Sequence, residues 1–177
     1  LGKTALANDF LTPEEVPSYK ISLPLRLVLC TDCSLVQLAD TVDPKVLYSR
    51  YAYITSTSQT MDKHLAEQSA HLLATGNLGR GAKVLEIASN TGVFLKKFQE
   101  QGCEVLGVEP ATNIAEVAVK TGIPTRNEFF NAANAGKLKT DWGAADLILG
   151  RHVFAHIDDL HDLLTGLEAI SHPKTLV

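Results

Sequence analysis

The sequence predicts an α/β protein with a doubly wound, mostly parallel sheet, preceded by a small β-rich segment. From residue 83 onward, short apolar runs alternate with helical patterns, which is typical of βαβ units on a parallel sheet. Residues 1–57 differ, because they carry Pro13, Pro17 and Pro24 near their start, a close cysteine pair and alternating apolar stretches. We expect a partial N-terminal domain over 1–57, a linking helix over 58–79 and a main domain over 80–177.

The composition is that of a globular chain with one full core. The chain has 177 residues, of which 45% are hydrophobic and 20% charged. A net charge of -4 disfavours a nucleic-acid partner held through its phosphates. No apolar run approaches the roughly 20 residues of a membrane span, and the first residues lack the pattern of a signal peptide. We expect a cytoplasmic protein with a small-molecule ligand, no nucleic-acid partner and no membrane association.

The N-terminal part is predicted to hold short strands and few helices. Apolar residues alternate over 21–29, which predicts a strand, and a second short strand is expected over 35–38. A helical turn is expected to begin at Asp43-Pro44. A longer helix is predicted over 60–74, stopped by Gly76.

The main part is predicted to alternate strand and helix throughout. Gly102 and Gly122 follow predicted helices at the point where a left-handed residue is needed. A final strand is expected to begin at Leu176. The other strands are expected over 84–88, 104–109, 123–126 and 145–149, and the helices over 92–101, 113–120, 131–137 and 158–170. Five apolar side chains of the last helix are expected to point inward: Leu160, Leu163, Leu164, Leu167 and Ile170.

The segment from Glu86 to Gly92 is a strand that runs into a small, polar turn opening a helix. Small residues let a ligand approach the backbone, and a helix N-terminus offers unpaired N–H groups. The three glycines of the dinucleotide fingerprint are absent, which disfavours a nicotinamide cofactor. Taken alone, the segment fits a simple turn without a ligand equally well.

Glu109 closes the second strand of the main part, roughly twenty residues after the first turn. In doubly wound folds an acid at this place accepts hydrogen bonds from both ribose hydroxyls. The alternative is a solvated acid at a strand end. The turn that precedes Glu109 and the Pro110-Ala111 pair that follows it favour an adenosine ligand.

Cys30 and Cys33 have the spacing of half a tetrahedral zinc site. A redox pair is the competing interpretation, but such a pair normally opens a helix after a strand, whereas this one is predicted to join two strands. Cys103 stands alone before an apolar strand and is expected to be a small buried hydrophobic residue. With three cysteines a disulfide framework is disfavoured.

These motifs together resemble the sugar C-methyltransferases that combine a zinc-binding N-terminal domain, a methyltransferase domain and a C-terminal domain. The resemblance extends along nearly all of the chain. It departs at Ala88 and Thr91, where the family usually has glycine and aspartate, and at Arg151 and His152, where it usually has a small residue and asparagine. The matching segments are 1–8, 30–38, 51–58 (including Ser56 and Thr57), 107–115, 129–130 and 153–157.

The resemblance implies a Rossmann-like class I methyltransferase that uses S-adenosylmethionine. Glu109 would hold the ribose, Pro110 and Ala111 would approach the adenine, and Phe129 would flank it. The methyl group of Ala88 is expected either to crowd the cofactor or to force a positive φ angle. Five residues would line the methionine end of the cofactor: Glu86, Ala88, Ser89, Asn90 and Gly92.

Three further residues are candidates for a catalytic role. His156 would orient the substrate or move a proton, and Tyr51 and Tyr53 would cover the active site. The alternatives are a structural hydrogen-bonding role for the histidine and packing between the two parts for the tyrosines. The resemblance implies that the base and the enolate-stabilising residues lie in a segment after the fifth strand.

The expected function is methyl transfer to a carbon next to a ketone in a nucleotide-linked deoxysugar. The alternatives are an O- or N-methyltransferase of another small molecule, and a non-catalytic module in which the four departures reflect loss of the cofactor. The chain is expected to be a fragment, because it lacks an initiator methionine and ends at the opening of a strand. We expect it to be inactive by itself, because the segment after the fifth strand, in which the resemblance places the base and the enolate-stabilising residues, is missing. The resemblance places the other two ligands of a structural zinc upstream of Leu1.

Overall fold

The computed structural model describes residues 1–55 and 58–177. It divides the chain into two compact units, Leu1–Tyr53 and Ile54–Val177. The expected domain boundary at residue 57, together with Ser56 and Thr57 of the matching segment 51–58, lies outside the described residues. The proposed division into residues 1–57, 58–79 and 80–177 therefore stays a prediction.

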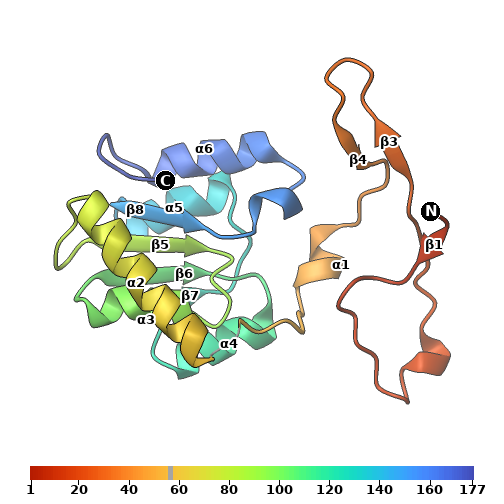
Figure 1. Cartoon of the computed structure of the whole chain (residues 1–177), viewed down its shortest axis with the longest axis horizontal. Coiled ribbons are helices and arrows are strands. Elements are labelled where there is room, and N and C mark those ends of the chain that lie inside the picture. The colour runs from red at the N-terminus through yellow and green to blue at the C-terminus, as the bar shows by residue number, and fades with distance from the viewer. Residues whose placement is uncertain (56–57) are drawn as a thin grey trace. The chain divides into compact units, whose positions relative to one another are not determined.

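The second unit is built on a four-stranded sheet in which every strand runs parallel to its neighbours (Figure 1). The strand order is β7-β6-β5-β8, so β5, the first strand of this unit, lies inside the sheet, and the chain returns past it from β7 to reach β8. Because the strands are parallel, all their carboxyl ends lie at one edge of the sheet. The strands are β5 (Lys83–Ile87), β6 (Glu104–Val108), β7 (Thr125–Arg126) and β8 (Leu147–Gly150).

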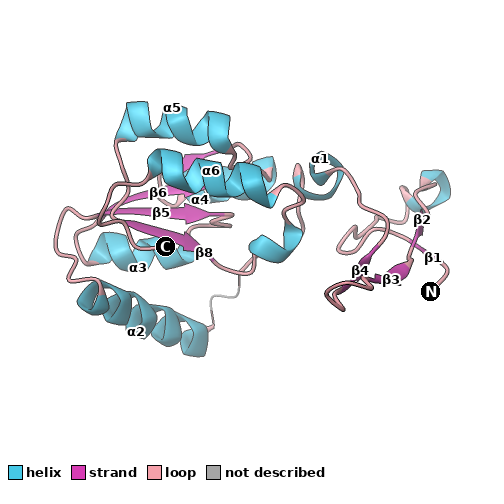
Figure 2. Cartoon of the chain, turned by 90° about the horizontal axis from the view of Figure 1, so that it is seen from above, coloured by secondary structure: helices cyan, strands magenta, loops and turns pink. Residues whose placement is uncertain are grey.

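Helices cover both faces of this sheet, as Figure 2 shows. One face carries α2, α3 and α4, whose buried side chains join a single apolar cluster, and the other carries α5 and α6. The predicted doubly wound parallel sheet is therefore confirmed. The helices are α2 (Gln59–Thr75), α3 (Val93–Glu100), α4 (Thr112–Lys120), α5 (Ala132–Trp142) and α6 (Leu160–Ile170), with a short 3₁₀ helix at Phe154–His156.

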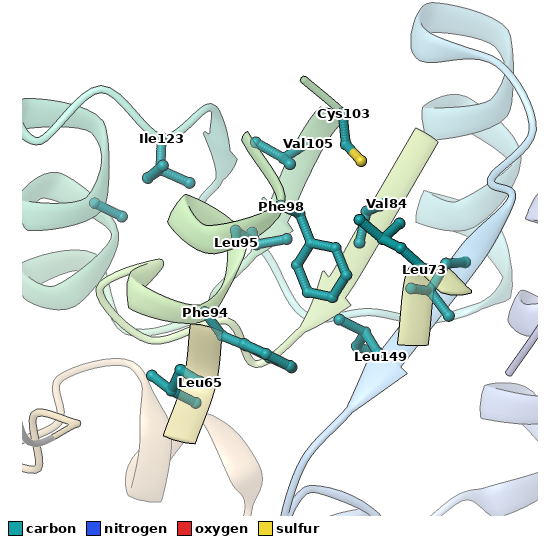
Figure 3. Packing of buried hydrophobic residues seen from close by; sticks show 12 residues of the cluster. Leu65, Leu73, Val84, Phe94, Leu95, Phe98, Cys103, Val105, Ile123 and Leu149 are labelled. Carbon is teal, nitrogen blue, oxygen red and sulfur yellow. The ribbon is translucent and has the colours of Figure 1, made fainter. Parts of the chain in front are cut away.

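The first apolar cluster centres on α3 (Figure 3). Phe94 and Phe98 are one helical turn apart and fully buried, with their rings edge to face and their centroids 5.0 Å apart. Leu65 and Leu73 of α2 pack against the same cluster. Cys103 is buried in it, which confirms the expectation of a small hydrophobic residue.

The second apolar cluster lies between the sheet, α5 and α6. Gly166 lets α6 lie close to the start of α5, because a Cβ at this position would meet the Phe130 ring at 3.0 Å and the backbone of the N-cap residue Asn131 at 3.1 Å. Leu163, Leu167 and Ile170 are buried as expected. The inward prediction is wrong for Leu160 and Leu164, which are 47% and 55% exposed, because the buried face of α6 runs through Gly166 instead.

The ends of several elements follow the predicted signals. Gly102 and Gly122 take φ angles of 88° and 86°, as expected after a helix. Gly76 follows α2 with φ -79°, and the left-handed residue there is Asn77 instead. Leu176 forms an isolated parallel bridge with Leu147 at the place where a fifth strand is expected to begin, so that strand stays a prediction.

The first unit consists of short antiparallel strand pairs and one short helix. The strand expected over 21–29 is divided, because β2 pairs with β1 while β3 pairs with β4. No described side chain in residues 1–53 is buried. The elements are β1 (Lys3–Thr4), a 3₁₀ helix (Val16–Ser18), β2 (Leu23–Pro24), β3 (Leu27–Leu29), β4 (Val36–Leu38) and α1 (Pro44–Tyr48).

A membrane span is not among the helices that the structure describes. Within residues 1–55 and 58–177, no helix has both the length and the apolar character needed to cross a bilayer.

Candidate functional site

The candidate site lies where the chain leaves three neighbouring strands, β5, β6 and β8. Side chains and backbone groups from these three places are joined by hydrogen bonds. Glu109, just after β6, binds the turn after β5 through Asn90. Arg151, just after β8, binds Glu86 near the end of β5. The parallel sheet thus gathers residues far apart in sequence at its carboxyl edge.

The turn after β5 has an unusual backbone. Ala88 and Asn90 both take φ 52°, and Gly92 takes φ 74°. Asparagine and glycine adopt this left-handed region readily, whereas alanine adopts it only with backbone strain. The second of the two expectations for Ala88, a positive φ angle, is therefore confirmed. A side chain at Gly92 is excluded on steric grounds as well, because a Cβ there would meet Ile123 at 2.8 Å.

Glu109 is buried, with 5% of its surface exposed. Its Oε2 accepts a hydrogen bond from the N–H of Asn90, and its Oε1 accepts one from the N–H of Ala111, both at 2.9 Å. Burial raises the pKa of Glu109, while these two hydrogen bonds oppose the rise. A carboxylate has about four acceptor sites, so both oxygens can still accept hydrogen bonds from a ligand.

Glu86 is 1% exposed and forms an ion pair with Arg151. The Nε and one terminal nitrogen of Arg151 each lie 2.9 Å from Glu86 Oε1. Burial raises the pKa of Glu86 from its usual 4.5 to about 7, although the charge of Arg151 acts in the opposite direction. The Cζ atom of Arg151 also lies over the Phe94 ring, 4.3 Å from its centre, so a cation–π contact helps to fix the position of the guanidinium.

Three buried polar atoms at this turn have no hydrogen-bond partner among the described residues: Glu86 Oε2, Ser89 Oγ and Thr91 Oγ1. Buried polar atoms in native proteins are nearly always partnered, so such a cluster indicates a place for a polar ligand or water. The Ser89 hydroxyl lies over Gly107, where a Cβ would meet it at 2.4 Å. Of the three, Glu86 Oε2 is the oxygen that belongs to a carboxylate, so it suits a cationic hydrogen-bond donor.

The residues expected near the adenine lie around the turn after β6. Ala111 is fully buried at the start of α4, and Pro110 and Phe129 are partly buried. Asn127 fixes this turn, because its side-chain amide donates to the carbonyls of Glu109 and Pro110 at 2.9 and 3.0 Å. Sequence reasoning missed Asn127, since nothing in the pattern around it indicates which backbone groups it binds.

The three candidate catalytic residues fall in different units. His156 is exposed in the 3₁₀ helix that follows β8. Tyr51 belongs to the first unit, where its ring centroid lies 5.7 Å from that of Tyr48 and 6.4 Å from that of Tyr53. The Tyr51 hydroxyl accepts a hydrogen bond from Asn8. The catalytic roles of these residues stay predictions.

Cys30 and Cys33 lie in the turn between β3 and β4, as predicted. Hydrogen bonds from the backbone N–H of Cys33, and then of Asp32, lower the pKa of the Cys30 thiol. This favours the thiolate, which is the form that binds metals. No third His, Cys, Asp or Glu joins the pair within the described ranges, so these residues fit half of a zinc site.

The comparison with protein families agrees with this geometry. Residues 59–177 match the family described as "Methyltransferase domain", and residues 1–48 match one described as "Putative zinc binding domain". The first match covers more than half of the chain. The chain therefore belongs to the methyltransferase-domain family.

Individual relatives were also found. The chain is 35% identical over 175 residues to the C-methyltransferase NovU of Streptomyces niveus, covering 99% of this chain but 42% of that protein. Among solved structures, it is similar to the magnesium protoporphyrin IX methyltransferase of Synechocystis PCC 6803, with TM-score 0.48, 16% identity, and 63% and 54% of the two chains covered. It is also similar to a methyltransferase of Thiobacillus denitrificans, with TM-score 0.47 and 19% identity, over 62% of this chain and 46% of that one.

We predict that Ala88→Gly stabilises the chain by about 1 kcal/mol, because glycine takes a positive φ angle without strain. Urea denaturation of both proteins measures the difference. Ala70→Gly serves as a control, because Ala70 is exposed in the middle of α2 and should lose about 0.5–1 kcal/mol on the same change. Equal losses in both variants would contradict strain at Ala88.

We predict that stability falls as pH rises from 4.5 to 7. The pKa of Glu86 is higher in the folded chain than in the unfolded chain, so the folded state binds more protons in this window. A shift from 4.5 to about 7 corresponds to at most about 3 kcal/mol. Denaturation at both pH values measures the slope. Glu86→Gln, whose side-chain oxygen can still accept a hydrogen bond from Arg151, should remove this decrease in the free energy of unfolding. Glu116→Gln, on the exposed side of α4, should leave the decrease unchanged.

Proposed function

We propose that this chain binds S-adenosylmethionine at the carboxyl edge of its sheet and is the cofactor-binding part of a C-methyltransferase. The observation that carries the proposal is the buried Glu86 oxygen without a donor, at the same edge as the oriented carboxylate of Glu109. One site suits a cationic group and the other suits a pair of hydroxyls. The family match and the NovU relative support this assignment.

Under this proposal each turn contributes to one part of the cofactor. Glu86, Ala88, Ser89, Asn90 and Gly92 form the wall at the methionine end. Glu109 accepts hydrogen bonds from the ribose hydroxyls, while Pro110, Ala111 and Phe129 surround the adenine. When bound, S-adenosylmethionine supplies an electrophilic methyl group on its sulfonium.

The acceptor that we propose is a carbon next to a ketone in a nucleotide-linked deoxysugar. Methylation there requires removal of a proton, stabilisation of the enolate and its alignment with the methyl group. His156 follows β8 at the carboxyl edge, so it is our candidate for orienting the substrate or moving the proton. Tyr51 and Tyr53 remain candidates for covering the site. The chain spans 42% of the NovU relative, and the activity we propose is that of a whole protein in the cytoplasm.

We predict that the chain binds S-adenosylhomocysteine in a calorimetric titration and that Glu109→Ala weakens binding at least about 10-fold. The change removes a charged acceptor of hydrogen bonds, worth about 1.5–3 kcal/mol. Glu104→Ala is the matched control, because Glu104 lies on the same strand at the opposite end and is exposed.

Three results would contradict parts of this assignment. A folded chain that shows no saturable binding would favour a non-catalytic module without cofactor. Saturable binding that is equally tight in the Glu109→Ala variant would show that Glu109 does not hold the ribose. A product methylated on oxygen or nitrogen, formed by a longer protein containing this chain, would favour the other transferase classes.

We also propose that Cys30 and Cys33 supply two thiolate ligands to a structural zinc. The first unit supports this proposal, since it has no buried side chain among its described residues and therefore little apolar core to hold it together. Domains with so small a core usually need a metal or a disulfide.

We predict weak zinc binding by this chain, with release of protons, because only two thiolates are present at the turn. Calorimetric titration with zinc chloride measures it. Cys33→Ser should abolish the binding, whereas Cys103→Ala should leave it unchanged, since Cys103 is buried in the second unit. Unchanged binding in the Cys33→Ser variant would contradict the proposed ligands.

A further inference from the structure

Arg151 is held in one orientation at the candidate site. Its Nε and one terminal nitrogen both face the same oxygen of Glu86, and the Phe94 ring stacks against its guanidinium. The side chain is 28% exposed, although its partner Glu86 is almost fully buried. Arg151 is thus anchored on a buried charge and still presents part of its surface outward.

Over residues 1–55 and 58–177, the ion pair leaves both hydrogen-bond donors and a hydrogen-bond acceptor without partners. A guanidinium carries five N–H donors, and Glu86 is the hydrogen-bond acceptor for Arg151 among the described residues. On the other side of the pair, Glu86 Oε2 is buried and has no donor within the part of the chain that the structure describes. Unused donors and an unused acceptor therefore belong to one side-chain pair.

We propose that Arg151 is a specificity-determining residue that binds the α-carboxylate of the cofactor's methionine end, while Glu86 Oε2 accepts from the α-ammonium. This inference rests on the proposed function, because it assumes that the cofactor occupies this edge of the sheet. An amino-acid end carries both charges on one carbon, which suits a neighbouring anion and cation.

Charge balance supports this assignment. Glu86 and Arg151 are formally neutral as a pair, and an amino-acid group is also formally neutral, so its entry adds no net charge to the site. Without Arg151, the ammonium would neutralise Glu86 and leave the carboxylate without a partner in a partly buried place. Charged groups in such surroundings are costly unless they are paired.

The fixed orientation of Arg151 supports the assignment as well. An arginine must normally lose side-chain freedom before it binds a carboxylate with two parallel hydrogen bonds. Here Glu86 and Phe94 already restrict the guanidinium. Ligand binding therefore loses less side-chain entropy at Arg151.

The opposite role for Arg151 predicts the opposite result. If Arg151 covered Glu86 and had to leave before the ammonium bound, removing it would tighten binding. If it binds the carboxylate, removing it weakens the binding of ligands that have the carboxylate and of no others.

The test is a calorimetric titration of the 177-residue chain with two probes. One is S-adenosylhomocysteine, and the other is its decarboxylated analogue, which keeps the amine. We expect Arg151→Gln to weaken binding of the first about 10- to 100-fold, the loss expected for charge-assisted hydrogen bonds. Binding of the analogue should stay unchanged, and the unsubstituted chain should prefer S-adenosylhomocysteine by a similar factor.

Two further variants complete the design. Arg151→Lys keeps the charge opposite Glu86 but loses the planar fork, so it should lie between the unsubstituted chain and Arg151→Gln, and it carries the test if Arg151→Gln fails to fold. Arg126→Gln is the matched control, because Arg126 ends the edge strand β7 and pairs with Asp141 instead. Its affinity for both probes should equal that of the unsubstituted chain.

The outcomes separate the inference from the function on which it rests. A folded chain that binds neither probe overturns the proposed function. Binding of both probes with equal affinity, unchanged by Arg151→Gln, overturns the role of Arg151 and leaves cofactor binding standing. Tighter binding by Arg151→Gln overturns it too and shows that Arg151 covers the site.

Discussion

The carboxylate of Glu109 joins the two turns on which the site depends. Each of its oxygens accepts one backbone N–H, from Asn90 after β5 and from Ala111 after β6. Because the carboxylate is buried, the cost of removing it from water must be offset by these bonds. The same contacts that stabilise the two turns also fix the direction in which the carboxylate faces a ligand.

The second buried acid depends on its partner in a different way. Glu86 lies within the central strand and would be strongly disfavoured as an isolated charge. Arg151, which follows the neighbouring strand β8, compensates for that charge but pairs with only one of the two oxygens. The pair therefore offsets the burial of the charge and still leaves one oxygen of Glu86 without a donor among the described residues.

The departures from the family motif have different structural consequences. At Ala88 the backbone keeps the left-handed conformation that suits the usual glycine, so the substitution adds strain without altering the turn. At Arg151 the substitution adds a charged group to the edge of the sheet. The first departure changes the strain in the turn, while the second changes the charge next to Glu86.

The sequence by itself determined the doubly wound sheet, the order of its elements and the turns after β5 and β6, because these follow from local periodicity and from glycines at helix ends. Only the tertiary structure decided the Glu86–Arg151 pair, the role of Asn127 and the outward position of Leu164. Glu86 and Arg151 are 65 positions apart, and no local pattern encodes their contact. Pairing across strands depends on register and packing, which arise only when the whole sheet forms.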